Sequence, residues 1–128
     1  MEPNDGVTAK SYHQANTMED SVLVDLRTYR VKPGTAQAQM DAYEKYGLAT
    51  QIKYCGEPIA YLSAESGDLN TLVHLWAFKD AGDRAERRAA MSKEAAWQEY
   101  VRKNAENGYI VDQRTSLMVP AKFAPIKR

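Results

Sequence analysis

The sequence lacks the features that mark several large classes of protein. Its 128 residues include one cysteine, Cys55, which excludes a disulfide framework and a thiolate cluster for structural zinc. No apolar run approaches the roughly 20 residues that span a bilayer, and no apolar segment follows the first methionine, so we expect neither a membrane span nor a secretory signal peptide. With 17 basic and 17 acidic residues, the chain has no net positive charge to attract nucleic acid. These absences predict a reducing, cytoplasmic location and no nucleic-acid partner.

The common cofactor and hydrolase motifs are also missing. The chain has no glycine-rich phosphate loop, no pair of histidines at metal-binding spacing and no Gly-x-Ser-x-Gly elbow. We therefore expect no metal and no cofactor. What is present is a composition of 44% hydrophobic and 27% charged residues, which is typical of a single globular domain.

The first twenty residues differ from the rest of the chain. Residues 1–20 are polar and show the period of neither a helix nor a strand, so we interpret them as a flexible leader. Acidic residues outnumber the single lysine of this segment, which is the wrong sign for a mitochondrial transit peptide. Residues 21–128 form the single predicted domain.

Strand and helix patterns alternate through this domain. Runs rich in strand formers predict strands over 22–31, 58–65, 71–78 and 109–119. Helix formers predict one helix over 36–49 that bends near Gly47, and residues 50–55 either finish this helix or form a connector. A second helix is predicted to start after Asp80 and to restart near Ser92. The order β-α-β-β-α-β is that of a ferredoxin-like α+β fold, in which two helices cover one face of a four-stranded antiparallel sheet. The other face must be wet, hold a ligand or pair with another sheet.

Side chains alternate across a strand, which divides the sheet into two sets of residues. We expect the smaller aliphatic set to lie under the helices, because such residues pack well there. The open face then carries a mixed set of aromatic and ionisable residues: Asp25, Arg27, Tyr29, Tyr61, His74, Trp76 and Phe78. The pattern of the fourth strand does not decide its orientation. Two such faces stacked together would enclose a cavity with aromatic walls and a few polar groups.

Several segments resemble the NIPSNAP family. They are Val24-Asp-Leu-Arg-Thr-Tyr-Arg-Val-Lys-Pro-Gly34, the strand Gly67 to Phe78 with its His-Leu-Trp sequence, the arginine-rich segment Asp83 to Met91 and the ending Val119 to Pro125. Asp25 is a departure, because the family usually has Glu there. The resemblance implies a dimeric α/β barrel, in which two ferredoxin-like protomers pack sheet against sheet. Relatives of that fold include cofactor-independent monooxygenases, isomerases, cyclases and haem-degrading enzymes, whereas eukaryotic members of the family are linked to vesicle transport and mitochondrial quality control through protein contacts.

Three ionisable residues are the candidate catalytic groups. His74 has a side chain that titrates near neutral pH and is a candidate general acid or base, although a structural histidine with a fixed hydrogen bond is the alternative. Arg27 with Asp25 is suited to hold a substrate carboxylate or oxyanion, or else forms a buried ion pair. The candidate substrate-binding residues are Tyr29, Tyr61, Trp76 and Phe78, which either stack on an aromatic substrate or fill the dimer core.

The sequence is compatible with two functions from different classes. One is a homodimer that binds a small aromatic or apolar molecule in its cavity, as a cofactor-independent enzyme in which His74 moves a proton. The other is a non-catalytic interaction or scaffold dimer whose cavity is filled by its own side chains. Haem binding through His74 follows only from the relatives of the fold. A cavity of several hundred cubic ångströms would favour the ligand-binding protein.

Other features have simpler interpretations. Arg84, Arg87 and Arg88 form one local basic face, which we expect to be solvated and paired with Asp83 or Glu86. Cys55 is expected to pack inertly. The apolar residues after Pro120 are expected to dock on a neighbouring surface.

Overall fold

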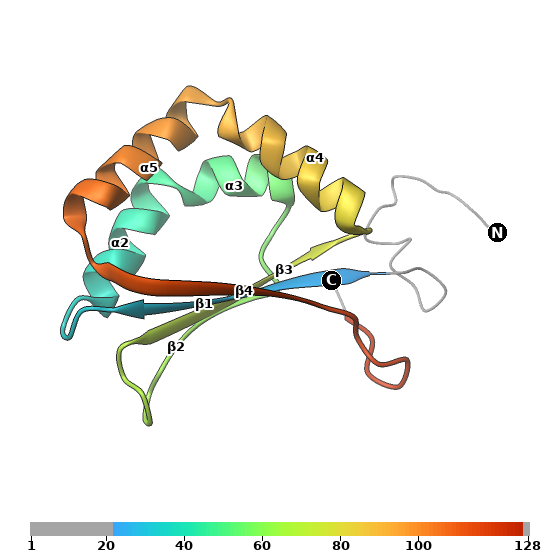
Figure 1. Ribbon diagram of the computed structural model, residues 1–128, viewed down its shortest axis with the longest axis horizontal. Coiled ribbons are helices and arrows are strands. Elements are labelled where there is room, and N and C mark those ends of the chain that lie inside the picture. The colour runs from blue at the N-terminus through green and yellow to red at the C-terminus, as the bar shows by residue number, and fades with distance from the viewer. Residues whose placement is uncertain (1–21, 127–128) are drawn as a thin grey trace.

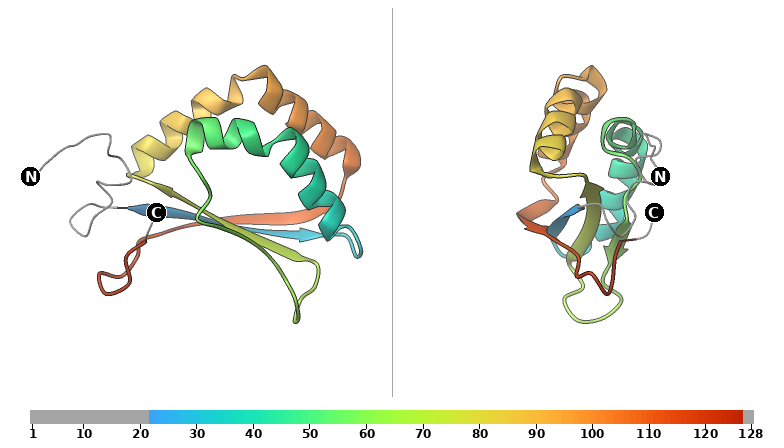
Figure 2. Two further views of the ribbon diagram at one scale, coloured as in Figure 1. Left: turned by 180° about the vertical axis from the view of Figure 1, so that it is seen from behind. Right: turned by 90° about the vertical axis from the view of Figure 1, so that its right-hand side faces the viewer.

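Four antiparallel strands form one sheet, in the order β2-β3-β1-β4. The computed structural model describes residues 22–126, so the predicted leader lies outside the described residues. The strands are β1 (Leu23–Val31), β2 (Ala60–Ser63), β3 (Thr71–Phe78) and β4 (Ile110–Met118). This is the predicted ferredoxin-like α+β arrangement, with all of the helices on one side of the sheet (Figures 1 and 2).

Each predicted helix consists of two helices joined end to end. The described helices are α2 (Ala36–Tyr46), α3 (Leu48–Cys55), α4 (Ala81–Ser92) and α5 (Ala95–Asn107). Both pairs bend at their junction, so together they form an arch over the sheet (Figure 1). The sequence-based bend near Gly47 and the restart near Ser92 are thus confirmed. No helix among residues 22–126 is long and apolar enough to span a membrane.

Local side chains explain where these helices begin and break. Asp80 precedes α4, and its Oδ1 accepts a hydrogen bond of 2.8 Å from the backbone N–H of Asp83, which satisfies a free donor of the first turn. At the α2–α3 junction, Gly47 lies against two aromatic rings. A Cβ atom there would meet ring atoms of Tyr43 and Tyr100 at 3.1 Å, so only glycine fits without displacing them.

The main core lies between the sheet and the helices. Its buried members come from both layers: Tyr43, Cys55, Trp76, Phe78, Met91 and Tyr100. Cys55 is 3% exposed, and burial raises the pKa of its thiol, which agrees with the predicted packing role. A smaller cluster of Val22, Val24 and Ala77 covers part of the opposite face, where Ile126 from the C-terminal segment packs on its own protomer.

The predicted assignment of the two faces is wrong. In the register, Asp25 pairs with Trp76, and His74 pairs with Arg27 on one side and with Tyr61 on the other. Residues directly opposite in a ladder share a face, and the burial of Trp76 and Phe78 in the main core places this face under the helices. The arched helices leave space for large rings, whereas the smaller residues such as Leu75 lie on the open face.

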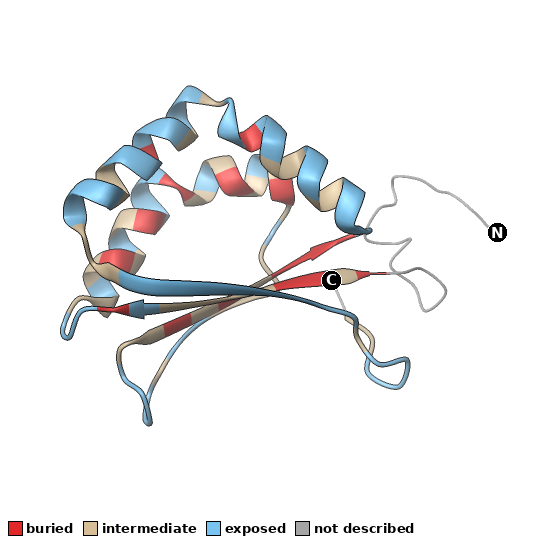
Figure 3. Ribbon diagram, in the orientation of Figure 1, coloured by how far each residue is buried: buried red, intermediate tan, exposed pale blue. Residues whose placement is uncertain are grey.

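The register also settles the orientation of β4. Gln113 lies opposite Tyr29, and Leu117 lies opposite Asp25, so both share the helix side of the sheet. No residue of β4 is buried on either face, and the strand is exposed over most of its length (Figure 3). The helices therefore cover the other strands and leave this edge of the sheet open.

Candidate functional site

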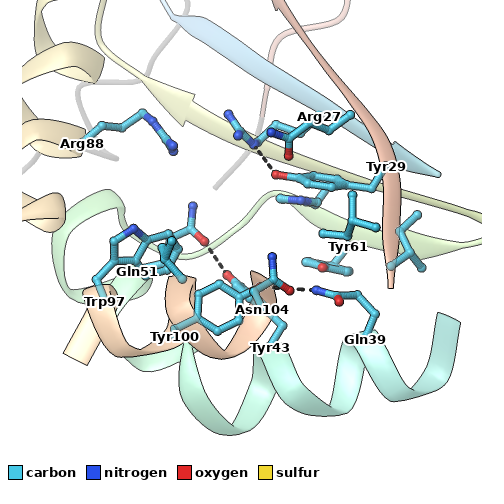
Figure 4. A pocket seen from close by; sticks show the side chains of 15 residues that line it. Arg27, Tyr29, Gln39, Tyr43, Gln51, Tyr61, Arg88, Trp97, Tyr100 and Asn104 are labelled. Carbon is cyan, nitrogen blue, oxygen red and sulfur yellow. Dashed lines mark hydrogen bonds between the residues drawn. The ribbon is translucent and has the colours of Figure 1, made fainter. Parts of the chain in front are cut away.

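A cavity of about 240 Å³ lies between the sheet and the arch of helices. Its walls combine rings, amides and guanidinium groups from both layers (Figure 4). Val101 of α5, which is 50% exposed, and the exposed Gln113 of β4 both line it, so we place its mouth between α5 and the open edge of the sheet. This cavity lies within one protomer, whereas the sequence predicts a cavity between two stacked open faces.

Two guanidinium groups reach the cavity from opposite layers. Arg27 of β1 donates a hydrogen bond of 3.0 Å from Nε to the hydroxyl of Tyr29. Arg88 of α4 makes no hydrogen bond or ion pair with any residue in the described part of the chain. Burial lowers the pKa of Arg88, and the positive charges of Arg27 and Arg84 lower it further.

One buried carboxylate lies behind these cations. Asp25 is 0% exposed, and its Oδ2 accepts 2.8 Å from Nε of Arg84 and 3.5 Å from Nη1 of Arg27. Its other oxygen has no hydrogen-bond partner within residues 22–126. Asp25 does not line the cavity, so it acts on the cavity through Arg27. The expectation of a solvated basic face is wrong for two of its three members, because Arg84 pairs with the buried Asp25 and Arg88 lines the cavity. The third, Arg87, does pair with Asp83, at 2.8 Å.

His74 is held by three aromatic neighbours. Its ring stacks between Tyr29 and Tyr61, with centroids 4.9 and 4.5 Å away and interplanar angles of 13° and 8°. Its Nδ1 accepts a hydrogen bond of 2.7 Å from the indole N–H of Trp76. Burial lowers the pKa of His74 to about 3, and the charge of Arg27 acts in the same direction. The imidazole is therefore neutral at physiological pH and carries its proton on Nε2.

This state changes the chemistry that His74 can perform. A base with a pKa of about 3 does not take up a proton at neutral pH, and Nδ1 is already occupied. The general-base role predicted from the sequence is therefore not supported by the geometry. The Nε2–H group is a hydrogen-bond donor. A structural histidine with a fixed hydrogen bond, which is the alternative role given above, would present the same donor.

Amide and hydroxyl groups line the opposite side of the cavity. Tyr43 donates to Oε1 of Gln51 at 2.7 Å, and Nε2 of Gln39 donates to the hydroxyl of Tyr100 at 3.3 Å. Gln39 is 2% exposed, yet its Oε1 accepts no hydrogen bond from the described residues, and neither does Oδ1 of Asn104. Each unpaired buried acceptor costs about 1–3 kcal/mol. Burial raises the pKa of Tyr100 to about 12, so this hydroxyl stays neutral.

The predicted site residues are only partly brought together. Arg27, Tyr29, Tyr61 and His74 line the cavity, and Asp25 lies behind it. Trp76 and Phe78, which the sequence predicts to contact a substrate, are 1% exposed in the main core, and neither lines the cavity.

Sequence reasoning missed the helical half of the lining. These residues are Gln39, Tyr43, Gln51, Arg88, Trp97, Tyr100, Val101 and Asn104. One signal was available, because Gln39 and Tyr43 lie four residues apart on one face of a helix and a glutamine on a buried face needs partners. In the part of the chain that the structure describes, no group of three or more His, Cys, Asp or Glu side chains is arranged to hold a metal ion.

The architecture identifies the structural class of the protein. A four-stranded antiparallel sheet with the strand order given above, covered on one face by helices, is a ferredoxin-like α+β domain, and here it holds an internal cavity. The chain belongs to the NIPSNAP family, whose model matches residues 24–125.

Relatives support this membership. A protein NipSnap homolog of Dictyostelium discoideum is 36% identical over 100 residues, which cover 77% of this chain and 43% of that protein. Human protein NipSnap homolog 3A is 30% identical over 81 residues, which cover 62% of this chain and 32% of that protein. The chain thus matches less than half the length of these curated relatives.

Solved structures give the same fold. A NIPSNAP family protein of unknown function from Agrobacterium tumefaciens is 34% identical, with a TM-score of 0.76 over 82% of this chain and 93% of that chain. An uncharacterized NIPSNAP-like domain protein from Burkholderia xenovorans is 36% identical, with a TM-score of 0.75 over 81% and 89% of the two chains. A putative antibiotic biosynthesis monooxygenase from Nitrosomonas europaea, 16% identical with a TM-score of 0.58 over 77% and 89%, shows a likeness of fold alone.

Proposed function

We propose that this protein binds a small, partly apolar molecule in the cavity between its sheet and its helices. The observation that carries the proposal is the cavity itself: at about 240 Å³ it has room for about eight water molecules, and its own side chains do not fill it. Rings of Tyr29, Tyr61 and Trp97 supply apolar walls, and a few convergent polar groups supply orientation, which is the usual composition of a small-molecule site.

The polar groups suit stabilisation of negative charge. Arg27, Arg88 and Nε2–H of His74 are donors, and the lining tyrosines whose pKa values burial raises are neutral. A reaction that this cavity would accelerate is one in which charge develops on a substrate oxygen, because fixed donors in a site shielded from water stabilise such a transition state. Removal of one donor of this kind typically costs about 10²–10³ in kcat. We propose this cofactor-independent role in place of proton abstraction by His74. Haem ligation is not proposed, because the hydrogen bond from Trp76 occupies the lone pair of Nδ1 and leaves the proton on Nε2, so neither nitrogen of His74 has a free lone pair.

The open face of the sheet supports a homodimer. It carries Leu62 and Met118, which are 53% and 51% exposed, beside the partly buried Leu75. These two side chains lie on the two edge strands, and apolar surface exposed on one sheet face suits an interaction with another protein surface. We propose that a second copy covers it, as the resemblance to dimeric α/β barrels implies. The scaffold alternative is a dimer as well, so the filling of the cavity distinguishes it and the assembly does not. Light scattering tests the homodimer itself, since a homodimer has twice the subunit mass in pure protein.

Blocking the mouth tests the binding proposal. A Val101→Trp variant places a large ring at the exposed rim of the cavity, whereas Ala96→Trp adds the same ring to an exposed position of α5 outside the lining. Native mass spectrometry of protein purified from its own host, together with a thermal-shift screen of small aromatic compounds, reports retained and added ligands. We expect binding by the parent chain and by Ala96→Trp, and none by Val101→Trp. Equal binding by both variants would place the ligand elsewhere.

A further inference from the structure

The charges beside the cavity do not balance. In the part of the chain that the structure describes, Asp25 supplies the only carboxylate among the charges that act on Arg88, and it faces three guanidinium groups, those of Arg27, Arg84 and Arg88. Arg84 and Arg27 hold Oδ2 of this carboxylate, and Arg88 has no anionic partner in the described chain. A half-buried cation that is repelled by two neighbours and paired with none is an arrangement that an anion would complete.

The two guanidinium groups that reach the cavity can share one anion. Arg27 projects from β1 of the sheet and Arg88 from α4 of the helical layer, and Figure 4 shows both above the space that the rings surround. Guanidinium presents a planar set of donors that matches the two oxygens of a carboxylate. The hydroxyl of Tyr29, which accepts from Nε of Arg27, has its own proton left to donate.

The opposite side of the cavity has different chemistry. Gln39 and Asn104 lie on the lower side of Figure 4, away from the two arginines, and each has a buried carbonyl oxygen that no described residue satisfies. Gln39 is 2% exposed, so its amide is shielded from bulk solvent. A hydroxyl group on a ligand would satisfy these amides. The rings of Tyr43, Tyr100 and Trp97 lie on the same side, and they favour a flat molecule between the two ends.

We propose that the ligand is a small aromatic carboxylate with a hydroxyl group at its far end. Its carboxylate lies between Arg27 and Arg88, and its hydroxyl hydrogen-bonds to Gln39 and Asn104. This inference rests on the proposed function, because it names the chemical class of the molecule that the cavity takes. It assigns Arg88 as a specificity-determining residue, whereas the sequence predicts a solvated position.

Three probes separate the contributions of the two ends. Isothermal titration calorimetry compares 4-hydroxybenzoate with its neutral methyl ester, which lacks the charge, and with benzoate, which lacks the hydroxyl. Each probe is titrated into the parent chain, Arg88→Met and Arg114→Met. Arg114 is exposed on β4 opposite Thr28, so it faces away from the helices, and its replacement changes the net charge equally. Methionine keeps the aliphatic stem of Arg88, and no ion pair within residues 22–126 is broken.

The expected result is a charge preference that depends on Arg88. The parent chain and Arg114→Met bind the acid at least about tenfold more tightly than the ester, and Arg88→Met binds the two within about twofold. Benzoate binds the parent chain more weakly than 4-hydroxybenzoate. Equal affinities for acid and ester in the parent chain would overturn the inference, and so would a preference that persists in Arg88→Met.

The failure of this inference differs from the failure of the proposed function. If the ester binds as well as the acid and Val101→Trp abolishes both, the cavity binds ligands but not by charge, and only the present inference is wrong. If none of the three probes binds at millimolar concentration, the present inference is also wrong. The proposed function itself fails if the parent chain neither retains a molecule nor responds to any compound of the thermal-shift screen.

Discussion

Replacement of Asp25 by asparagine is the most direct perturbation of the buried charges. The change removes the carboxylate that pairs with Arg84, at 2.8 Å, and with Arg27, at 3.5 Å. Loss of one partner of a buried ion pair typically costs about 3–5 kcal/mol, because the remaining charge stays buried. The side chains of Arg84 and Arg27 are 23% and 12% exposed, so water screens part of this cost. We expect the free energy of unfolding to fall by about 2–4 kcal/mol.

Urea unfolding measures this loss. For a chain of this size the slope of stability against urea is about 1–2 kcal/mol per molar, so the midpoint should fall by about 1–4 M at unchanged slope. Asp112→Asn is the matched control, because Asp112 pairs with Arg30 at 3.6 Å and both side chains are about half exposed. That pair should contribute less than about 1 kcal/mol.

A double variant identifies the cause of the loss. Asp25→Asn combined with Arg84→Met removes the cation that the first change leaves unpaired, so it should regain about 1–2 kcal/mol relative to the sum of the two single changes. The reasoning is refuted if Asp25→Asn costs no more than Asp112→Asn. It is also refuted if the two changes in the double variant are simply additive, because the measured cost would then not come from the pair.

Three further predictions concern other parts of the site. His74 has a pKa of about 3 in the folded protein and about 6.5 when unfolded, so its contribution to stability is complete above pH 6.5. This contribution is lost as the pH falls toward 3, by about 1.4 kcal/mol per pH unit. Urea unfolding across this range should show that the free energy of unfolding of His74→Gln depends less on pH than that of the parent chain. Arg88→Met should raise the free energy of unfolding of the ligand-free protein by about 0.5 kcal/mol, because it removes repulsion without breaking a pair, and a decrease measured by urea would contradict this. Gly47→Ala should cost about 1–3 kcal/mol in the same assay, because the new Cβ meets rings at 3.1 Å, whereas Gly82→Ala, with its nearest contact at 3.5 Å, should cost less.

The strands and helices could be predicted because their signals are local. Strand β3 has the bounds that the pattern indicates, and β1 begins one residue later than expected. Gly47 marked the break between α2 and α3, since a residue without a side chain in a helical stretch indicates close approach or a bend. Strand β2 is shorter than predicted: alternation continues over 58–65, but the ladder with β3 extends only over Ala60–Ser63.

The side of the sheet that the helices cover could not be derived from size alone. Both sets of side chains on β1 and β3 contain apolar residues, so the choice depends on the distance between the two layers, and that distance is set by helical bends far away in the sequence. For the same reason, the lining residues that the helices contribute could not be predicted from the sequence. Arg88 lies one turn after Arg84 on a face that the sequence predicts to be solvated. Only the path of α4 over the sheet shows that Arg84 contacts Asp25 and that Arg88 lines the cavity.

The breaks in the helical layer have a consequence for variation within this architecture. The free volume exists because two helical spans each change direction, at Gly47 and between Ser92 and Ala95, and thus rise away from the sheet. It does not depend on a gap left by small side chains in the walls. Exchanges among the lining residues would therefore alter which molecule fits while the chamber persists, so one backbone can serve different ligands.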